Sequence, residues 1–221
     1  MTLNDVQYLE AGQLTWHDHH AAYLAVVLEG CYEEFGDQGR VVAEAGTAIV
    51  HWPFERHGNK VATGGARIVN LHLPIREAFS LSSMKLDDPE RMLRAAHEGA
   101  PLSDALNCGG TTLVGHVKED VDLIALGLVH GSLSSLSEFA CDLGVAPRTL
   151  RRRFSALYGM SAASFRARTR AQRAWRDVMT TSTSLAAIAY DHGFADQAHM
   201  TRAIVRLTAA APSEWRRVVA V

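Results

Sequence analysis

The spacing of hydrophobic residues along the chain changes at about residue 80. Before that point the apolar residues gather in short runs that are rich in Val, Ile and Leu and are bounded by Gly, Asp or Pro. The clearest runs are AYLAVVLEG, GTAIVHW and ARIVNLHLP. Short apolar runs between turn residues are typical of β-strands. Beyond residue 80 nearly every apolar segment has helical spacing, so the pattern predicts a two-domain α+β protein with a β-domain over residues 1–80.

Helical segments are expected to connect the β-domain to the C-terminal region. Residues 87–99, DDPERMLRAAHEG, have acidic residues and Pro89 in the first turn and Gly99 at the end, which are start and stop signals of a helix. Residues 114–132 predict a second helix. We therefore place domain boundaries after residues 80 and 131. They leave a helical connection over residues 81–131, which is a candidate dimerisation element, and a C-terminal domain over residues 132–221.

The C-terminal region contains an internal repeat with a period of 50 residues. Apolar positions of one helical face recur in the second copy: Leu150, Phe154 and Leu157 as Met200, Ile204 and Leu207. Upstream of them an Ala and a Gly recur 49 residues later: Ala140 and Gly144 as Ala189 and Gly193. The small Ala lets two helices approach closely, and Gly adopts turn conformations that a Cβ would strain. Each copy predicts a helix-turn-helix unit, and a long helix is expected to join the two units.

The charge of the chain is divided unevenly between its two parts. The 221 residues carry a formal net charge of −2. From Ser134 onward, 13 Arg and no Lys stand against 6 acidic residues, a net charge of +7, which leaves −9 for the first 133 residues. Such asymmetry indicates that one part meets a polyanion. A basic face can also be merely solvated, so charge alone leaves both interpretations open.

The longer helix of each unit carries polar residues on the face opposite its apolar stripe. At about 100° per residue, Leu150, Phe154 and Leu157 lie on one buried side of the first such helix. Guanidinium groups near the start of an exposed helix suit contacts with guanine in the major groove of DNA. The DNA-binding candidates are Arg148, Arg151 and Arg152 in the first copy and Gln197, Thr201 and Arg202 in the second. Because Ala198 and Val205 also project outward, we expect weaker base readout from the second helix.

These motifs resemble the DNA-binding domain of the AraC/XylS family of bacterial transcription regulators. The resemblance covers residues 134–217 and follows the family's order and spacing in FACDLGVAPRTLRRRF, YGMSAASF, SLAAIAYDHGFADQAHMTR and APSEWRR. It implies that the two sets of candidates lie where recognition helices touch bases. Some positions depart from the family pattern. Met200 and Ile204 replace residues that are usually aromatic or Leu, and Ala209 replaces a usual Gly at a helix end.

The N-terminal β-domain resembles the cupin-like sensor domain of the same family. The similar segments are LTWHDHHAAYLAVVLEG and GTAIVHWPFERHGN. The resemblance implies a cupin-like β-barrel and places His57 at the position of the histidine in the second cupin motif. His17 and His19 share a strand face because side chains alternate along a strand, whereas His20 is expected to point the other way.

These histidines are the predicted effector-binding site. His17, His19 and His57 are expected to converge inside the β-domain. His72 and Asn70 are expected to contribute from a neighbouring strand. Three neutral imidazoles can bind zinc or another divalent metal, so His17, His19 and His57 are also the candidate metal ligands. The acidic ligand expected in the first motif is absent, with Tyr23 and Leu24 in its neighbourhood. The alternative is a small-molecule pocket lined by hydrogen-bonded histidines that hold no metal.

Cysteine usage and hydropathy set further expectations. Cys31, Cys108 and Cys141 are far apart and lack CxxC spacing, which argues against a disulfide framework and against a zinc site made of cysteines. We expect all three to be reduced and buried. No segment approaches the roughly 20 apolar residues that a membrane span needs, and the first residues lack the pattern of a signal peptide. The expected protein is cytoplasmic and has no membrane partner.

The sequence as a whole favours a transcription regulator rather than an enzyme. Such a regulator binds double-stranded DNA in a sequence-specific manner and responds to a small molecule or metal sensed by the β-domain. RNA polymerase and a second copy of the chain, in a homodimer, are further candidate partners. The alternative is a metal-dependent cupin enzyme with an accessory DNA-binding domain. A third interpretation, an interaction module with a solvated basic face, predicts no duplex binding at physiological salt.

Overall fold

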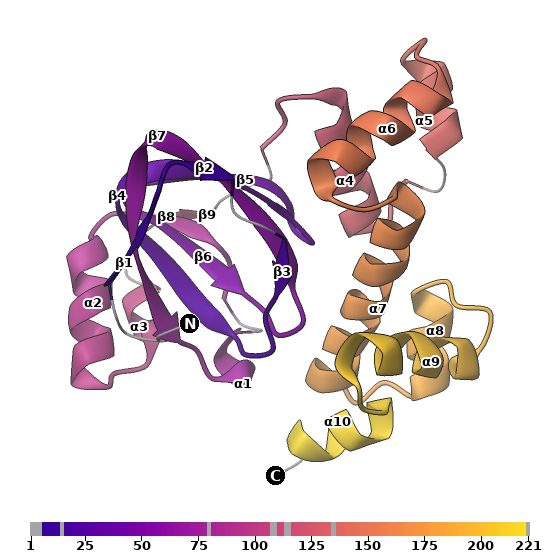
Figure 1. Ribbon diagram of the computed structural model, residues 1–221. Coiled ribbons are helices and arrows are strands. Elements are labelled where there is room, and N and C mark those ends of the chain that lie inside the picture. The colour runs from indigo at the N-terminus through magenta and orange to yellow at the C-terminus, as the bar shows by residue number, and fades with distance from the viewer. Residues whose placement is uncertain are drawn as a thin grey trace. The chain divides into compact units, whose positions relative to one another are not determined.

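The chain folds into two compact units. The computed structural model describes residues 6–13, 16–78, 81–106, 110–112, 116–133 and 136–219. The N-terminal unit, Met1–His116, is built on a β-sheet, and the C-terminal unit, Val117–Val221, is helical (Figure 1). This is the α+β organisation that the change in hydrophobic spacing predicts. The division between the units lies after residue 116, whereas the sequence suggested divisions after residues 80 and 131.

Nine antiparallel strands form the sheet of the N-terminal unit over the described residues. They are β1 (Val6–Leu9), β2 (Gly12–Gln13), β3 (His17–Asp18), β4 (Tyr23–Gly36), β5 (Gly39–Glu44), β6 (Thr47–His51), β7 (Arg56–His72), β8 (Met84–Leu86) and β9 (Gly110–Thr112). Three helices accompany them: α1 (Ile75–Ala78), α2 (Pro89–Glu98) and α3 (Leu102–Leu106).

The strands pair in the order β1-β7-β4-β6-β8-β9, while β2 and β3 pair with β7 and β5 pairs with β4. Within the described part of the chain, β1 and β9 stand at opposite ends of this order and do not pair with each other. The sheet is therefore not closed into the barrel that the resemblance implied. The edge beyond β6 is made of strands of only three residues each, β8 and β9.

Both faces of the long strand β4 are buried. Leu24 and Val26 pack in one apolar cluster together with Met92 of α2, and Figure 1 shows α2 and α3 beside the sheet. Tyr23 and Val27, which alternate with them, pack in a second cluster on the other face. Burial of both faces explains why this strand reads as a continuous apolar run in the sequence.

An irregularity in the pairing of β4 with β7 changes which residues of β4 face the second cluster. The register shifts between Val27 and Glu29 and again between Gly30 and Tyr32. Such bulges exchange the two faces of a strand, because side chains alternate with a period of two. Before the irregularity odd-numbered residues such as Val27 face the second cluster, and after it Tyr32 does so.

The two helices predicted between the β-domain and the C-terminal region are both present. The first, α2, has Asp88 at its N-cap, where the side chain accepts a hydrogen bond from the backbone N of Arg91 at 3.1 Å. It ends at Gly99 in the left-handed conformation, with φ of 70°. The second helix, α4 (Asp120–His130), ends in the same way at Gly131, with φ of 74°.

The helix α4 belongs to the C-terminal unit rather than to a separate connection. Its residues Val121, Ile124 and Leu128 are buried, so an isolated α4 would leave apolar surface in water. The hydroxyl of Tyr158 also donates a hydrogen bond to Asp122 of α4. These contacts explain why the boundary expected near residue 131 differs from the observed division.

The rest of the C-terminal unit consists of six helices over the described residues. They are α5 (Leu136–Asp142), α6 (Pro147–Tyr158), α7 (Ala162–Thr180), α8 (Leu185–Asp191), α9 (Gln197–Thr208) and α10 (Pro212–Val219). The pairs α5–α6 and α8–α9 are the two predicted helix-turn-helix units, and α7 is the long helix between them. Their turns contain Gly144 and Gly193 with φ of 64° and 68°, and the preceding Ala140 and Ala189 are buried.

The buried stripe of α6 differs from the predicted one at its third position. Leu150 and Phe154 are fully buried as expected, but Leu157 is only half-buried and the third buried residue is Tyr158. The ring of Tyr158 stacks on Phe154 with a centroid separation of 4.7 Å, while its hydroxyl is satisfied by Asp122. The 50-residue repeat extends to this position, since Thr208 is buried at the end of α9.

Two of the three cysteines are exposed, so the expectation of burial was wrong for them. Cys31 lies beside the register shift of β4, where three consecutive residues of the strand are exposed. Cys141 follows the buried Ala140 and points away from the core of its helix pair. Cys108 lies outside the described residues. No helix in the described ranges has the length and apolar character required to cross a membrane.

Candidate functional site

The first recognition helix, α6, begins at Pro147 and presents its arginines to solvent. Arg148, Arg151 and Arg152 are all exposed. Arg151 donates a hydrogen bond of 3.3 Å from Nη2 to Ser137 Oγ of α5. Because Leu150 and Phe154 anchor the opposite side of α6 at 0% exposure, the arginines are held on the outward face. Arg153 is exposed as well.

The second recognition helix, α9, presents fewer polar groups. Asp196 caps it by accepting a hydrogen bond from the backbone N of His199 at 2.6 Å. Gln197 and Arg202 are exposed, while Thr201 is half-buried. The outward surface also includes two apolar side chains, Ala198 and Val205. This helix therefore offers fewer hydrogen-bond donors than α6.

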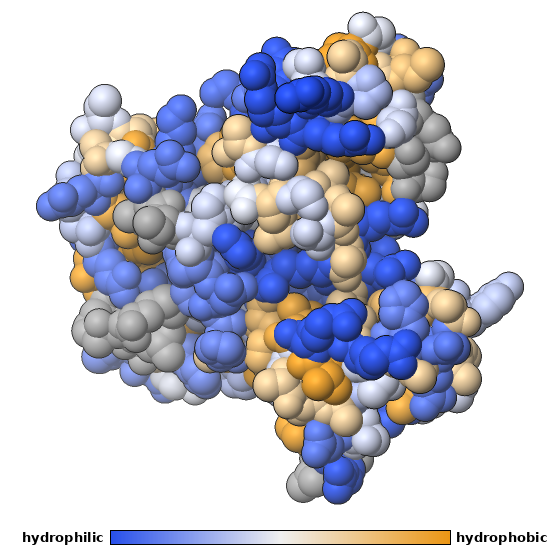
Figure 2. All heavy atoms as spheres, turned by 45° about the vertical axis from the view of Figure 1, so that its right-hand side comes forward, coloured by the Kyte–Doolittle hydropathy of each residue, from blue (hydrophilic) through white to orange (hydrophobic). Residues whose placement is uncertain are grey.

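The two helices carry equivalent side chains in equivalent places. Their buried residues correspond in pairs 50 residues apart: Leu150 with Met200, Phe154 with Ile204 and Tyr158 with Thr208. Arg152 and Arg202 consequently occupy the same place relative to the core of their units. Figure 2 shows hydrophilic side chains gathered at the level of α6 and again at the level of α9. An exposed basic helix in such a frame can enter the major groove of DNA.

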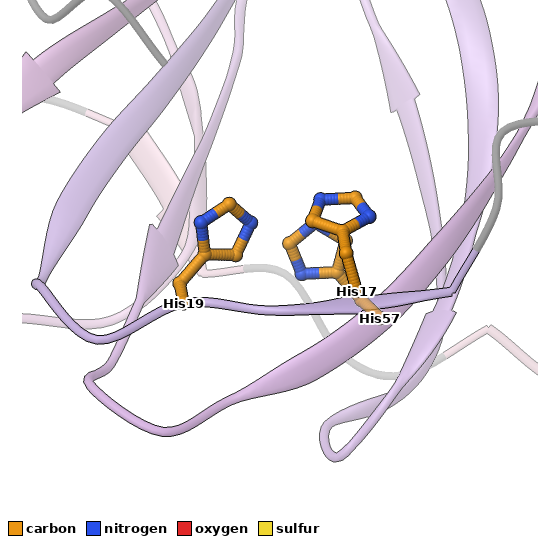
Figure 3. Close-up of side chains that lie close together, drawn as sticks. All are labelled: His17, His19 and His57. Carbon is orange, nitrogen blue, oxygen red and sulfur yellow. The ribbon is translucent and has the colours of Figure 1, made fainter.

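A cluster of histidines lies in the N-terminal unit. His17 of β3 is paired with His57 of β7 in the register of the sheet. The ring centroids of His17 and His57 are 4.5 Å apart, those of His17 and His19 are 4.7 Å apart, and those of His19 and His57 are 4.8 Å apart. Figure 3 shows His17 and His57 close together and His19 beside them. The structure thus brings together the three histidines that the sequence placed in one site.

The environment of His19 and His57 favours the neutral imidazole. Burial, followed by repulsion from His51 and His17, lowers the pKa of His19 to about 4. Burial, reinforced by His51, His17 and His19, lowers the pKa of His57 far below its ordinary value. An imidazole must be neutral to ligate a metal through its lone pair. At neutral pH both rings are available as metal ligands or as hydrogen-bond partners.

The histidines line a cavity of about 270 Å³. Its wall contains polar residues from several strands together with apolar ones: Gln7, Leu9, His17, His19, Tyr23, Ala25, Tyr32, Glu34, His51, His57, Asn59, Ile68 and Asn70. Tyr23 Oη lies 3.1 Å from His19 Nε2, at hydrogen-bond distance. His20 is exposed and lies against Phe54, which agrees with the expected alternation.

His72 does not lie in this cavity wall, in contrast to the prediction. It is the last residue of β7, two positions beyond Asn70, and its side chain is exposed. The strand has reached the rim of the sheet at that point, so the side chain points into solvent. Asn70, the other residue expected from this strand, is buried and does line the cavity.

Sequence reasoning missed two residues of the cavity that carry suitable chemistry, His51 and Glu34. His51 ends the buried strand β6, and Glu34 lies on β4 beyond its register shift. Burial raises the pKa of Glu34 to about 7, while His51 acts in the opposite direction and Glu55 in the same one. Burial acts to lower the pKa of His51, but Glu34 and a hydrogen bond with Glu55 outweigh it and raise this pKa. Carboxylates between two aromatic residues of a strand, Tyr32 and Phe35, are the signal that could have identified Glu34.

Comparison with known proteins identifies the C-terminal region. Residues 139–218 match a family described as a helix-turn-helix domain. No curated protein shows a significant match to the chain. Among solved structures, the C-terminal domain of AraT, a response regulator from Geobacillus stearothermophilus, is 20% identical, with coverage of 47% of this chain and 88% of that one and a TM-score of 0.43.

Two further solved structures are similar to the chain. A probable AraC family transcriptional regulator from Rhodopseudomonas palustris is 21% identical over 46% of this chain and 98% of that one, with a TM-score of 0.42. Apo ToxT K231A from Vibrio cholerae covers 99% of this chain and 100% of its own at 9% identity, with a TM-score of 0.44. At these TM-scores the likenesses do not extend the assignment beyond the matched domain. Together with the motifs of residues 134–217, the domain match assigns the C-terminal region to the helix-turn-helix domain of the AraC/XylS family of DNA-binding transcription regulators.

Proposed function

We propose that this chain is a sequence-specific transcription regulator whose N-terminal unit senses a small molecule or a metal ion. The observation that carries the proposal is the duplicated helix-turn-helix, in which Arg152 and Arg202 occupy equivalent exposed positions on α6 and α9. Guanidinium groups at such positions form bidentate hydrogen bonds with guanine in the major groove. A basic face that is merely solvated would not require two helix-turn-helix units with an arginine at the equivalent exposed position of each.

The length of α7 supports simultaneous reading of two segments of DNA. Its 19 residues span about 28 Å, since an α-helix rises 1.5 Å per residue. Successive faces of the major groove are about 34 Å apart. One chain is therefore suited to place α6 and α9 in two adjacent turns of one duplex. Because α6 carries three exposed arginines and α9 only one within the candidate set, α6 is expected to supply most of the base readout.

The cavity in the N-terminal unit supports the sensing part of the proposal. Ligand pockets combine apolar walls with a few convergent polar groups, as this cavity does. Its volume of about 270 Å³ fits a small molecule. His17, His19 and His57 are the proposed contacts to that molecule. In the metal alternative, the resemblance to a cupin-like sensor indicates the same three histidines as ligands. RNA polymerase and a second copy of the chain remain predicted partners.

Selection of bound duplexes from a pool of random DNA sequences tests the proposal. We expect a sharp motif with two elements separated by about one helical turn, and the stronger element is assigned to α6. Binding of the selected duplex and of a scrambled duplex is then compared at physiological salt. Equal affinity for both duplexes would contradict sequence-specific binding and would favour the interpretation of a basic face that is merely solvated.

A matched pair of variants locates the binding surface. Exchange of Arg148, Arg151 and Arg152 for Gln is expected to abolish preference for the selected duplex, because α6 then lacks its guanidinium groups. The control is Arg94→Gln, which removes an exposed arginine of α2 that pairs with Asp88 in the N-terminal unit. Loss of preference in the control as well would show that the selection responds to total charge.

A further inference from the structure

The orientation of His51 is fixed by a carboxylate. His51 is 1% exposed, and its ring stacks on Tyr23 with centroids 4.4 Å apart. Its Nδ1 lies 3.2 Å from Oε2 of Glu55, and the same oxygen accepts a hydrogen bond from the backbone N of Trp52 at 3.1 Å. An ionised carboxylate only accepts, so Nδ1 is the donor in this pair. In the neutral ring the lone pair then resides on Nε2, on the side of the cavity.

A second carboxylate faces that lone pair. Glu34 Oε2 lies 3.7 Å from His51 Nε2, which is too long for a hydrogen bond. This oxygen is buried and has no hydrogen-bond partner among the described residues. Its contact with His51 is long and makes no hydrogen bond, so the buried oxygen recovers only part of the hydration that it has lost. Glu34 is therefore suited to receive a cation.

His57 supplies a third buried polar atom that lacks a hydrogen bond. Its Nδ1 is buried and lacks a hydrogen-bond partner within the described part of the chain, and its ring centroid is 4.5 Å from that of His51. One ligand atom from each of Glu34, His51 and His57 can be chosen so that all lie within 4.8 Å of one another. Ligand atoms around a tetrahedral zinc ion are about 3.3 Å apart, given bonds of about 2.0 Å. Small side-chain rotations close that difference.

We propose that Glu34, His51 and His57 hold a divalent transition-metal ion, with Glu55 as the carboxylate that orients His51. This replaces two of the ligands that the sequence indicated, since only His57 is common to the two sets. Two imidazoles and a carboxylate are a donor set for zinc and for other first-row divalent ions. A histidine ligand that donates its other N–H to a carboxylate is a recurring arrangement in metal sites. The missing acidic ligand of the first motif is thus supplied from the far end of β4.

Glu34, His51 and His57, here called the inner set, are better placed to hold an ion than the outer set of His17, His19 and His57. All three of its members are at least nine-tenths buried, with exposures of 4%, 1% and 2% for Glu34, His51 and His57. His17 and His19 are half-buried, and His19 Nε2 already lies at hydrogen-bond distance from Tyr23 Oη. His17 and His19 line the same cavity, so they can contact a small molecule bound next to the ion. The metal assignment itself does not depend on the proposed function. Only an effect of the bound ion on DNA binding rests on the proposed sensing role of the cavity.

Metal titration of the full chain tests the assignment. Protein purified without a histidine tag and treated with a chelator is titrated with Zn(II) by calorimetry, and Co(II) is used in parallel because its visible absorption reports the ligand set. We expect one ion per chain. Glu34→Gln and His51→Gln should weaken binding by about a hundredfold or more and change the Co(II) spectrum, while Glu55→Gln should weaken it about 10- to 100-fold.

Controls separate the inner set from the outer one. The double variant His17→Ala, His19→Ala should retain affinity within about tenfold, and His72→Gln, which removes an exposed histidine outside the cavity, should behave as the unmodified chain. Thermal unfolding of each metal-free variant checks that it folds. Glu34→Gln is expected to raise the melting temperature of the metal-free protein and to abolish the increase that Zn(II) causes.

The outcomes that overturn the inference are distinct from failure of the proposed function. Full affinity in Glu34→Gln, with loss only in the double variant, would place the ion on the three histidines indicated by the sequence. If the unmodified chain binds neither Zn(II) nor Co(II), the proposal of a metal site is wrong. Sequence-specific DNA binding is measured separately, on the metal-free chain and on the Zn(II)-loaded chain. Absence of specific binding in both forms contradicts the regulator and leaves the metal assignment standing.

Discussion

The hydroxyl of Tyr158 donates a hydrogen bond of 2.8 Å to Oδ1 of Asp122, and both side chains are buried. The other carboxylate oxygen, Oδ2, accepts hydrogen bonds from the backbone N of Lys118 and of Glu119, at 2.9 and 2.8 Å. Asp122 thus satisfies the start of α4 and ties that helix to the end of α6. This carboxylate adds to the apolar contacts that hold α4 in the C-terminal unit.

Removal of the Tyr158 hydroxyl should therefore destabilise the C-terminal unit. We expect Tyr158→Phe to reduce the free energy of unfolding by about 1.5–3 kcal/mol, the range for a hydrogen bond to a charged group. Urea unfolding of the full chain measures the change. The matched control is Tyr190→Phe, since Tyr190 is 83% exposed and should tolerate the exchange. A loss below about 0.5 kcal/mol in Tyr158→Phe would contradict a stabilising role of this contact.

The two recognition helices should contribute unequally to base readout. Arg152→Ala is expected to weaken binding to the selected duplex by about 1–3 kcal/mol and to relax preference at one position. Arg202→Ala should cost less, because α9 presents fewer polar groups around it. Fluorescence anisotropy on matched and single-base-substituted duplexes measures both effects. A uniform loss on specific and random DNA would show that the two arginines contact only phosphates.

The end of α9 contains a residue in an unfavourable backbone conformation. Ala209 has φ of 61°, whereas the equivalent residue at the end of α6 is Gly159 with φ of 65°. A Cβ in this region costs about 1 kcal/mol. We expect Ala209→Gly to stabilise the chain by about 0.5–1 kcal/mol and Gly159→Ala to destabilise it by at least as much. Thermal unfolding should show opposite shifts, and shifts of the same sign would contradict this explanation. Ala210→Gly, one residue later, controls for the general effect of glycine.

The stability of the metal-free chain should depend on pH through Glu34. Its pKa is raised from 4.5 to about 7 in the folded state, so the folded state retains a proton that the unfolded state releases in this window. Stability contributed by this group is therefore lost as pH rises from about 4.5 to 7. The lowered pKa of His19 acts in the opposite direction, because the unfolded state then binds the extra proton below pH 6.5. A comparison of two proteins isolates the Glu34 contribution.

We expect Glu34→Gln to be more stable than the unmodified chain at pH 7 and to lose that advantage near pH 4.5, where the carboxyl is neutral in both states. Chemical unfolding of both proteins at several pH values measures the difference. His51 and Glu55 both influence the pKa of Glu34, so His51→Gln is a necessary second comparison. A difference that does not change with pH would show that Glu34 is ionised throughout.

The helical part of the fold could be predicted from the sequence because its signals are local and occur twice. The Ala–Gly spacing and the 50-residue period define both helix-turn-helix units without any tertiary information. The exchange of Leu157 for Tyr158 in the buried stripe was not predictable in this way. It depends on a partner, Asp122, that lies in a helix the sequence assigned to a different domain.

The histidine pocket could be predicted only in part. His17 and His57 are paired across two strands, and the motifs that contain them are readable. Glu34 reaches the cavity because the register of β4 shifts between Val27 and Tyr32, which places even-numbered residues where odd-numbered ones were before. Simple alternation from Tyr23 would have pointed Glu34 away. A bulge of this kind arises from pairing with β7 and leaves no clear pattern in β4 itself.

The exposed thiols make the two units separately addressable by chemistry. Cys31 belongs to the sheet unit and Cys141 to the helical unit, and both are accessible on the surface. In a Cys108→Ser background, a donor and an acceptor dye can be attached at these two positions. Energy transfer between the dyes would then report whether Zn(II) and DNA change the separation of the units, with one dye located beside the β4 bulge and the other beside the turn that precedes α6.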